Sequence, residues 1–201
     1  MKIELHLHTN RYSGCAAHSP ADMMRRLIET GYDVVFITEH DAVWSELELA
    51  ELQRDFSEIK ILPGMEISLR PGFKQHLLVL GTNDKAYLRI PVVADILQRA
   101  RAEDCLTVLA HPFRWEGGAD MLKANLRPDA MEARTCNQAL EQAETARREA
   151  ARLGLPVVNA GDVHAVGFIN RFWIETDRPV RQAADLRRIL ISGAYENRVG
   201  G

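Results

Sequence analysis

The sequence has few cysteines, little net charge and no long apolar run. Its three cysteines, Cys15, Cys105 and Cys136, show no CxxC spacing, which argues against a disulfide framework and favours a reducing cytoplasm. A net charge of -3 excludes a broadly basic nucleic-acid surface but not a local cationic pocket for a phosphate. Because no apolar stretch could cross a bilayer and a strand pattern begins at once, we expect neither a membrane span nor a signal peptide.

The remaining composition is that of an ordinary globular protein. Hydrophobic residues make up 46% of the chain and charged residues 26%. A chain of 201 residues can bury a large core, and this one contains neither a low-complexity linker nor a short repeat. We therefore predict a single domain over residues 1–201.

Short apolar runs alternate with amphipathic stretches. The predicted strands are Lys2–Thr9, Asp33–Thr38, Lys60–Ser68, His76–Gly81, Leu106–Ala110, Ala130–Thr135, Leu155–Ala160 and, more weakly, Phe172–Glu175. One predicted helix begins at Pro20, after Ser19 as its N-cap, and ends near Gly31; the others are Glu46–Ser57, Val92–Asp104, Asn137–Leu153 and Ala183–Ser192. Seven or eight such units, with apolar strands typical of parallel sheets, predict an α/β barrel rather than an open sheet.

Metal-capable side chains lie at the ends of these apolar runs. His6 and His8 are two residues apart, so a strand projects both from the same face. In parallel barrels the functional groups lie at the carboxyl ends of strands, which is where the sequence also has His40, Glu66, His111, Asp162 and His164. His76 is an exception because it starts its apolar run. Either that strand begins earlier or His76 reaches in from a loop.

Neutral imidazoles and carboxylates are suitable ligands for zinc, manganese or iron. A carboxylate such as Glu66 can bridge two ions, and neighbouring ions lower the pKa of a water and neutralise phosphoryl oxygens. A single histidine such as His76 or His111 is more often structural, and HxH by itself is a weak signal. Six of the seven histidines coincide with strand ends, however, which favours a metal site. The seventh, His18, precedes a helix cap and suits a surface or pocket-rim role, where it is a candidate substrate contact.

These short motifs together resemble a known family, the PHP (polymerase and histidinol phosphatase) superfamily. The chain has, in the family's order, His6-Leu7-His8-Thr9, Pro20, Thr38-Glu39-His40, Gly64-Met65-Glu66, His76, Ala110-His111-Pro112 and Asp162-Val163-His164. The resemblance extends from about Lys2 to Val166. Each motif is weak, but the ordered set is specific.

The resemblance implies a distorted (β/α)7 TIM-like barrel with a trinuclear metal site, so we expect two to three divalent ions (Zn, Mn or Fe). By position, one ion would be held by His6, His8, Glu66 and Asp162, and a second by Glu66, His76 and His111. A third would use His40, His164 and one residue of the loop after the first strand.

The loop after the first strand departs from the family pattern. The family usually has Asp or His there, whereas counting back from Pro20 puts Cys15 in this position. A thiolate binds zinc or iron well, His18 could bend in instead, or the position could be empty.

The same resemblance implies that Arg114, after Ala110-His111-Pro112, contacts a phosphate, since a guanidinium matches phosphate oxygens bidentately. Arg11 is a second candidate. We interpret the chain as a metal-dependent phosphoesterase, in which metal ions activate a water and Asp162 or a histidine-bound water protonates the leaving alcohol. The expected substrate is a small phosphorylated metabolite, with nucleotides next. The alternatives are a metal-dependent amidohydrolase acting on C–N bonds and a non-catalytic, metal-stabilised binding domain.

Overall fold

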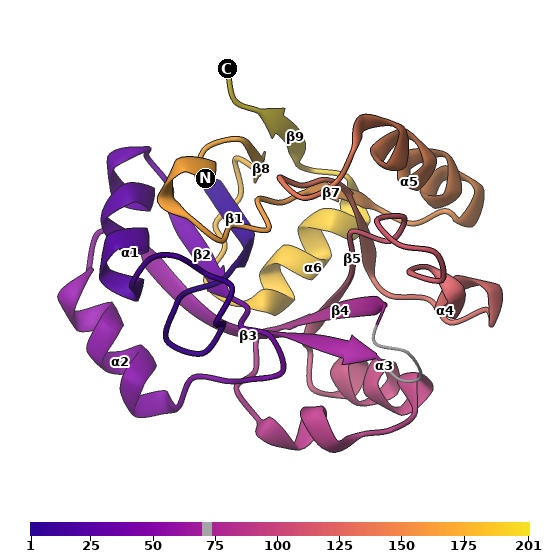
Figure 1. Ribbon diagram of the computed structural model, residues 1–201, viewed down its shortest axis with the longest axis horizontal. Helices are drawn as coiled ribbons and strands as arrows, with labels where there is room; N and C mark the ends of the chain where they lie inside the picture. The colour runs from indigo at the N-terminus through magenta and orange to yellow at the C-terminus, as the bar shows by residue number, and fades with distance from the viewer. Residues whose placement is uncertain (70–73) are drawn as a thin grey trace.

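The computed structural model describes residues 1–69 and 74–201, and their strands form one sheet with helices around it (Figure 1). The strands are β1 (Lys2–Leu7), β2 (Val34–Ile37), β3 (Lys60–Leu69), β4 (Gln75–Leu80), β5 (Leu106–Ala110), β6 (Ala130–Arg134), β7 (Val157–Asn159), β8 (Phe172–Glu175) and β9 (Glu196–Val199). The helices are α1 (Pro20–Glu29), α2 (Glu46–Asp55), α3 (Val93–Ala102), α4 (Asp120–Lys123), α5 (Leu140–Leu153) and α6 (Ala183–Ser192), with 3-10 turns η1 (Lys85–Arg89) and η2 (Val166–Phe168).

The sheet has the order β7-β6-β5-β4-β3-β2-β1-β8-β9. The pairs β1–β2, β2–β3, β5–β6 and β6–β7 are parallel, as the apolar runs predict. In contrast, β4 is antiparallel to both of its neighbours, and β8 is antiparallel to β1. The parallel arrangement that the apolar runs suggested therefore does not hold at β4 and β8. The amino end of β4 lies at the same edge of the sheet as the carboxyl ends of β3 and β5.

The sheet curves into a nearly closed barrel, which confirms the predicted α/β barrel fold. Val163, which follows β7, pairs with Leu7 of β1 in a parallel bridge. In this bridge the His8 amide donates to the Val163 carbonyl at 2.9 Å, and the Val163 amide donates to the His6 carbonyl at 3.0 Å. The two ends of the chain's ligand-bearing sequence, near His6 and near His164, are thereby brought side by side.

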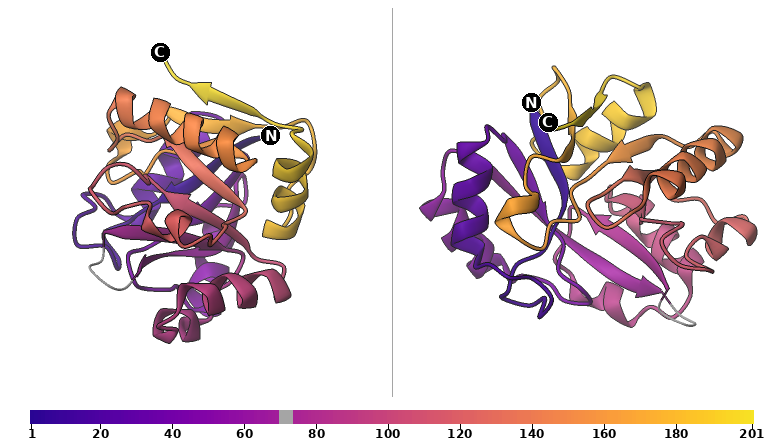
Figure 2. Two further views of the ribbon diagram at one scale, coloured as in Figure 1. Left: turned by 90° about the vertical axis from the view of Figure 1, so that its right-hand side faces the viewer. Right: turned by 45° about the horizontal axis from the view of Figure 1, so that its top comes forward.

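The barrel interior is filled by apolar side chains from the strands and from α6. Leu186 and Ile189 of α6 are buried in one cluster with alternate strand residues, among them Ile3, Leu5, Phe36, Leu78 and Val108. In Figure 1, α6 lies behind the strands near the centre of the ring, and Figure 2 shows the same helix from two other directions. Fully burying each such side chain contributes about 1.5–3 kcal/mol, so this cluster supports the strand ends that carry the polar residues.

Outside the barrel, α1 and α2 cover β1–β3, as Figure 1 shows on the left. Met23, Met24 and Leu27 of α1 are fully buried against the outward side chains of β2, Val35 and Ile37. Within the described residues, the longest helix is α5, and no helix has the length and apolar character needed to cross a membrane.

Local sequence signals set the helix ends as expected. The Ser19 hydroxyl accepts from the Asp22 amide at 3.2 Å, with Pro20 in the first turn. Gly154 and Gly193 end α5 and α6 with positive φ angles of 66° and 69°, which glycine adopts without strain. Several ends differ from the prediction: α2 ends at Asp55, α5 begins at Leu140, and β7 covers only Val157–Asn159.

The prediction missed α4 and β9. The helix α4 is a single turn, too short for a periodic pattern. All four residues of β9 are exposed, so this strand has no alternation of apolar and polar side chains to detect.

Candidate metal centre

One edge of the barrel brings together all eight predicted His, Glu and Asp ligands. They come from the carboxyl ends of the parallel strands, from the residues just after them, and from the amino end of β4: His6, His8, His40, Glu66, His76, His111, Asp162 and His164. The reversed direction of β4 removes the exception noted for His76. His76 starts its strand and still points to the same edge, because that strand runs the opposite way.

The carboxylate of Glu66 lies at the centre of this group and is fully buried. Its Oε2 is 3.2 Å from Nε2 of His6, 3.3 Å from Nε2 of His8 and 2.8 Å from Nδ1 of His40. Its Oε1 is 2.7 Å from Nδ1 of His76 and 3.0 Å from Nε2 of His111. The two oxygens of Glu66 thus face two different sets of imidazoles, which is the arrangement of a bridging carboxylate.

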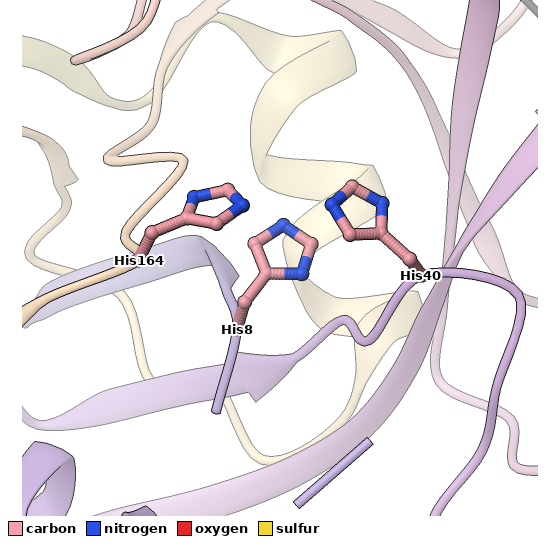
Figure 3. Close-up of side chains that lie close together, drawn as sticks. All are labelled: His8, His40 and His164. Atoms are coloured by element: carbon pink, nitrogen blue, oxygen red, sulfur yellow. The ribbon is translucent and has the colours of Figure 1, made fainter. Parts of the chain in front are cut away.

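A second cluster is formed by three histidines from distant parts of the chain, as Figure 3 shows. His8 follows β1, His40 follows β2, and His164 follows β7. The ring centroid of His8 is 4.2 Å from that of His40 and 4.3 Å from that of His164. One nitrogen from each of the three rings lies within 4.8 Å of the others, close enough to share one ion. His8 therefore belongs to this set as well as to the set that contains His6 and Glu66.

Asp162 contacts the cluster from the opposite side. Its Oδ1 is 3.5 Å from Nε2 of both His6 and His8, and its Oδ2 accepts from the Asn137 amide at 2.9 Å. Asp162 and His111 both adopt positive φ angles, 48° and 27°, a conformation that costs energy for residues other than glycine. Such strain persists where the surrounding structure holds a side chain in a functional position.

The geometry of the buried polar atoms fits a metal ion. Nε2 of His6, Nε2 of His8, Oε2 of Glu66 and Oδ1 of Asp162 are buried and lack a hydrogen-bond partner within the described residues. The opposite nitrogens of the rings are engaged: Nδ1 of His6 lies 2.8 Å from Glu132. Buried polar atoms without a partner are costly, and four that converge on one point indicate a cation site.

The charges of the cluster also suit a cation. Burial disfavours a buried imidazolium, but the carboxylates of Glu66, Glu132 and Asp162 outweigh it and raise the pKa of His6. Burial likewise opposes ionisation of Glu66 and Asp162, yet the imidazoles around them, His6 first, hold both carboxyl pKa values well below their usual range. Both are therefore ionised, which is the form that binds a metal. For Asp162, this favours the ligand role over the predicted proton-donor role.

Two buried carboxylates outside the ligand set were not recognised as site residues from the sequence. Glu132 on β6 is fully buried; its Oε1 accepts from Nδ1 of His6, and its Oε2 accepts from the His111 amide at 2.7 Å. Glu39 accepts from the Ser13 hydroxyl at 2.5 Å, and that hydroxyl lies 3.3 Å from Nδ1 of His8. These contacts orient His6 and His8 with Nε2 towards the cluster. A buried strand position for Glu132 is the only sequence signal that could have identified it.

A comparison with family models identifies the group to which the chain is related. A model described as the PHP domain matches residues 4–94, which include His6, His8, His40, Glu66 and His76 in the arrangement above. This match, over a little less than half of the chain, supports membership of the PHP superfamily. Over 65 residues, it is 35% identical to a DNA polymerase III PolC-type from Caldanaerobacter subterraneus subsp. tengcongensis, which corresponds to 32% of this chain and 5% of the polymerase.

Solved structures share the PHP-type fold across nearly the full chain. A two-domain protein of Bacteroides vulgatus that contains a predicted PHP-like metal-dependent phosphoesterase aligns with all of this chain and 65% of its own, at 14% identity and a TM-score of 0.72. An amidohydrolase from Chromobacterium violaceum, with bound sulfate and no metal, aligns over 98% of both chains at 15% identity and a TM-score of 0.68. A proposed metal-dependent phosphoesterase of Bifidobacterium adolescentis aligns over 94% and 95% at 15% identity and a TM-score of 0.62.

The loop position that the PHP pattern fills with Asp or His differs here. Cys15 is exposed, and among the described residues it belongs to none of the three sets of closely spaced ligand atoms. Although the residue is exposed, partial desolvation of its thiol raises the pKa of Cys15, and the nearby carboxylates of Glu66, Asp162 and Glu39 raise it further. Its role as a ligand stays a prediction.

The three predicted substrate contacts lie in different surroundings. The guanidinium of Arg114 is 3.7 Å from Oδ2 of Asp162 and stacks on Trp115 at 4.4 Å, which places it at the edge of the cluster. Arg11 donates through Nε to Glu48 of α2 at 3.0 Å. His18 lies before α1 with its Nδ1 buried. The contacts of Arg114 favour it over Arg11 as the residue that binds substrate.

Trp115 is a further residue at the site that the sequence did not reveal. Its ring lies 5.5 Å from that of His76 and 5.3 Å from that of His111, both edge to face. With 38% of its surface exposed, it stands between the buried histidines and solvent. Its place directly after Arg114 is the only sequence clue.

Proposed function

We propose that this chain is a metal-dependent hydrolase that cleaves phosphoesters. The observation that carries the proposal is the position of Glu66, whose two oxygens lie within 3.3 Å of five imidazole nitrogens from four parts of the chain. Membership of the PHP superfamily supports the same class of chemistry.

The residues divide naturally between two or three ions. Glu66 would bridge one ion held by His6, His8 and Asp162 and another held by His76 and His111. His40 and His164 would hold a third, together with His8, whose ring faces both. The donors, imidazole nitrogens and carboxylate oxygens, suit zinc, manganese or iron.

The charge of the site supports more than one ion. Of the five buried carboxylates among the described residues, the four in or directly beside the ligand cluster, Glu39, Glu66, Glu132 and Asp162, bring up to four negative charges into a space with little solvent. Two divalent ions neutralise four charges, and a third makes the site cationic. A cationic site attracts a phosphate group and stabilises the charge that develops on its oxygens.

When bound, the ions would lower the pKa of a water and so supply a nucleophile at neutral pH. The protein's own contribution is orientation. Glu132 and Ser13 fix the rings of His6 and His8, and Trp115 restricts access to His76 and His111. Arg114, held on the face of Trp115, would bind the non-bridging phosphate oxygens.

The substrate that we propose is a small phosphorylated metabolite, with nucleotides as the next candidate. The chain spans 5% of the length of the polymerase that it matches, so polymerisation is not carried over. Among the described residues, Arg114 is the one arginine that lies within 4 Å of a carboxylate of the ligand cluster. A single cation suits a single phosphate group better than an extended nucleic-acid backbone.

The second candidate is a metal-dependent amidohydrolase, which the fold of the Chromobacterium violaceum protein favours. Two features of the site oppose this alternative. The bridging position is occupied by Glu66, whereas amidohydrolase sites of this kind usually use a lysine, and Arg114 supplies a cation for a phosphate.

The direct test is release of inorganic phosphate from a panel of phosphorylated metabolites and nucleotides, with Mn²⁺ added. We expect turnover with metal, none after chelation, and little with Glu66→Gln. The surface variant Glu144→Gln on α5 makes the same chemical change away from the site and should behave as wild type. Cleavage of amides without phosphate release would favour the amidohydrolase. If fully metal-loaded protein showed neither activity, the remaining hypothesis would be a non-catalytic, metal-stabilised binding domain.

A further inference from the structure

Glu4 of β1 is a fully buried carboxylate that lies outside the ligand cluster. Its Oε1 accepts three backbone hydrogen bonds: from Leu5 at 3.0 Å, from His6 at 3.1 Å and from Gly161 at 2.7 Å. Two of these amides belong to β1, and the third belongs to the segment after β7. One side-chain oxygen therefore connects two segments that are 157 residues apart in sequence.

These segments form a seam, defined here as the junction between β1 and residues 160–163. The pairing of β1 with β2 is irregular between Glu4 and Leu7, so β1 bends where it reaches the seam. One step further along, Val163 pairs with β1 by backbone hydrogen bonds to His6 and His8. Two neighbouring sets of hydrogen bonds thus hold the two segments of the seam together: those of the Glu4 side chain and those of the Val163 backbone.

Gly161 leaves the space that Glu4 occupies. A Cβ at position 161 would lie 2.6 Å from Oε2 of Glu4 and 2.3 Å from a methyl group of Val163. Both distances are shorter than van der Waals contact allows, so a larger residue would displace the carboxylate or the segment. The next residue is Asp162, which has a positive φ of 48°.

We propose that Glu4 is a positioning residue for the metal centre. By holding the backbone of His6 and Gly161 together, it fixes the distance between the His6 ring and the Asp162 carboxylate, which lie on opposite sides of the seam and 3.5 Å apart. An apolar side chain at this position would leave three buried amides without an acceptor. The inference rests on the proposed function in one respect, because it takes His6 and Asp162 as ligands of a common ion.

The test measures Zn²⁺ affinity of the full chain by competition with a chromogenic chelator, together with the thermal midpoint of the metal-free protein. Glu4→Ala should lower the affinity of the tightest site about 10- to 100-fold, as loss of a group that orients a ligand does. Glu4→Gln should lower it less than about 10-fold, because an amide oxygen can accept the same three hydrogen bonds. This rescue separates positioning from a pure charge effect, for which both variants would lose affinity equally.

Two further variants keep the test decisive. Ile96→Ala on α3 removes a buried core side chain from a different cluster, which contains no residue of the seam, and it should lower the thermal midpoint while Zn²⁺ affinity stays within twofold of wild type. Gly161→Ala should weaken Zn²⁺ binding even if Glu4→Ala fails to fold. Combining it with Glu4→Gln should cost less than the product of the single effects, since both act on one contact.

The outcomes are distinguishable from failure of the proposed function. If wild type binds no Zn²⁺, the metal centre itself is wrong. If wild type binds Zn²⁺ but the Glu4 variants bind it equally well and lose only thermal stability, as expected for Ile96→Ala, Glu4 is a structural residue and the inference is overturned.

Discussion

Glu66 and His76 lie on neighbouring antiparallel strands, with Oε1 of Glu66 2.7 Å from Nδ1 of His76. His76 pairs directly with Ser68, two residues from Glu66, so the two side chains project from the same face of the sheet. This pairing brings the histidine of a reversed strand to a site otherwise built at the carboxyl ends of parallel strands.

Replacing Glu66 should abolish the function of the centre. Glu66→Gln keeps the shape of the side chain but removes the charge and one bridging oxygen. Mutation of a residue that only orients a metal ligand typically lowers metal affinity or activity about 10- to 100-fold. We therefore expect Glu66→Gln to lower phosphate release at least about a hundredfold and to decrease the metal content. Metal analysis and phosphate release, each compared with Glu144→Gln, measure this. Activity within a few-fold of wild type would refute the bridging role.

Removal of the metal should destabilise the protein. Without ions, the buried carboxylates Glu66 and Asp162 are opposed by imidazoles and, at Asp162, by the partly exposed Arg114 guanidinium. Ligands that bind only the folded state stabilise it. At a free-ion concentration a hundred times the dissociation constant, the loss is about 2.7 kcal/mol. Thermal melts with and without a chelator should show a lower midpoint that is restored by added Zn²⁺ or Mn²⁺. An unchanged midpoint would contradict a structural contribution from metal.

The stability of the metal-free protein should depend on His164 in mildly acidic solution. Burial, together with the nearby imidazole of His8, lowers the pKa of His164 to about 4. Between that value and the ordinary pKa of 6.5, the unfolded chain binds the proton and the folded chain does not. The unfolding free energy therefore falls as the pH decreases through this window. Its slope against pH approaches the value for uptake of roughly one proton on unfolding.

Denaturant unfolding at several pH values, with a chelator present, tests this prediction. His164→Gln has no group that titrates there, so its unfolding free energy should fall less steeply between pH 6.5 and pH 4 than that of wild type. Parallel curves for the two proteins would show that His164 titrates normally.

Arg114 should affect substrate binding more than metal binding. The charge-assisted hydrogen bonds that we expect between its guanidinium and a phosphate are worth about 1.5–3 kcal/mol, so Arg114→Ala should raise KM about 10- to 100-fold and leave metal content unchanged. Steady-state kinetics on the best phosphoester substrate measure the effect, with the exposed Arg147→Ala of α5 as the control. An unaltered KM would remove Arg114 from the phosphate site.

Glu132 should act through His6 and His111 without touching substrate. Glu132→Gln weakens the hydrogen bonds that orient the His6 ring and hold the His111 backbone. We expect a 10- to 100-fold loss of metal affinity, seen by chelator competition, and recovery of much of the activity at high metal concentration. If saturating metal restored nothing, Glu132 would have a role beyond orientation.

Sequence by itself predicted which side chains come together at the candidate metal centre and most of the elements that carry them. The spacing of His6 and His8 and the apolar runs that end at His40, Glu66 and His111 follow from local periodicity, which a strand imposes wherever it lies. The predicted barrel fold is confirmed, and the family-model match over residues 4–94 supports the predicted PHP superfamily. The helix ends at Ser19, Gly154 and Gly193 were also predicted from local sequence signals.

Tertiary structure alone decided how these residues meet. One clue to the direction of β4 lay in the chain: only five residues separate Leu69 from Gln75, too few for the crossover that a parallel neighbour requires. No such clue existed for Glu4 or Glu132, because their partners lie up to 157 residues away and depend on the closure of the barrel. Periodicity fixes which face a side chain takes, whereas contacts between distant strands depend on how the whole sheet curves.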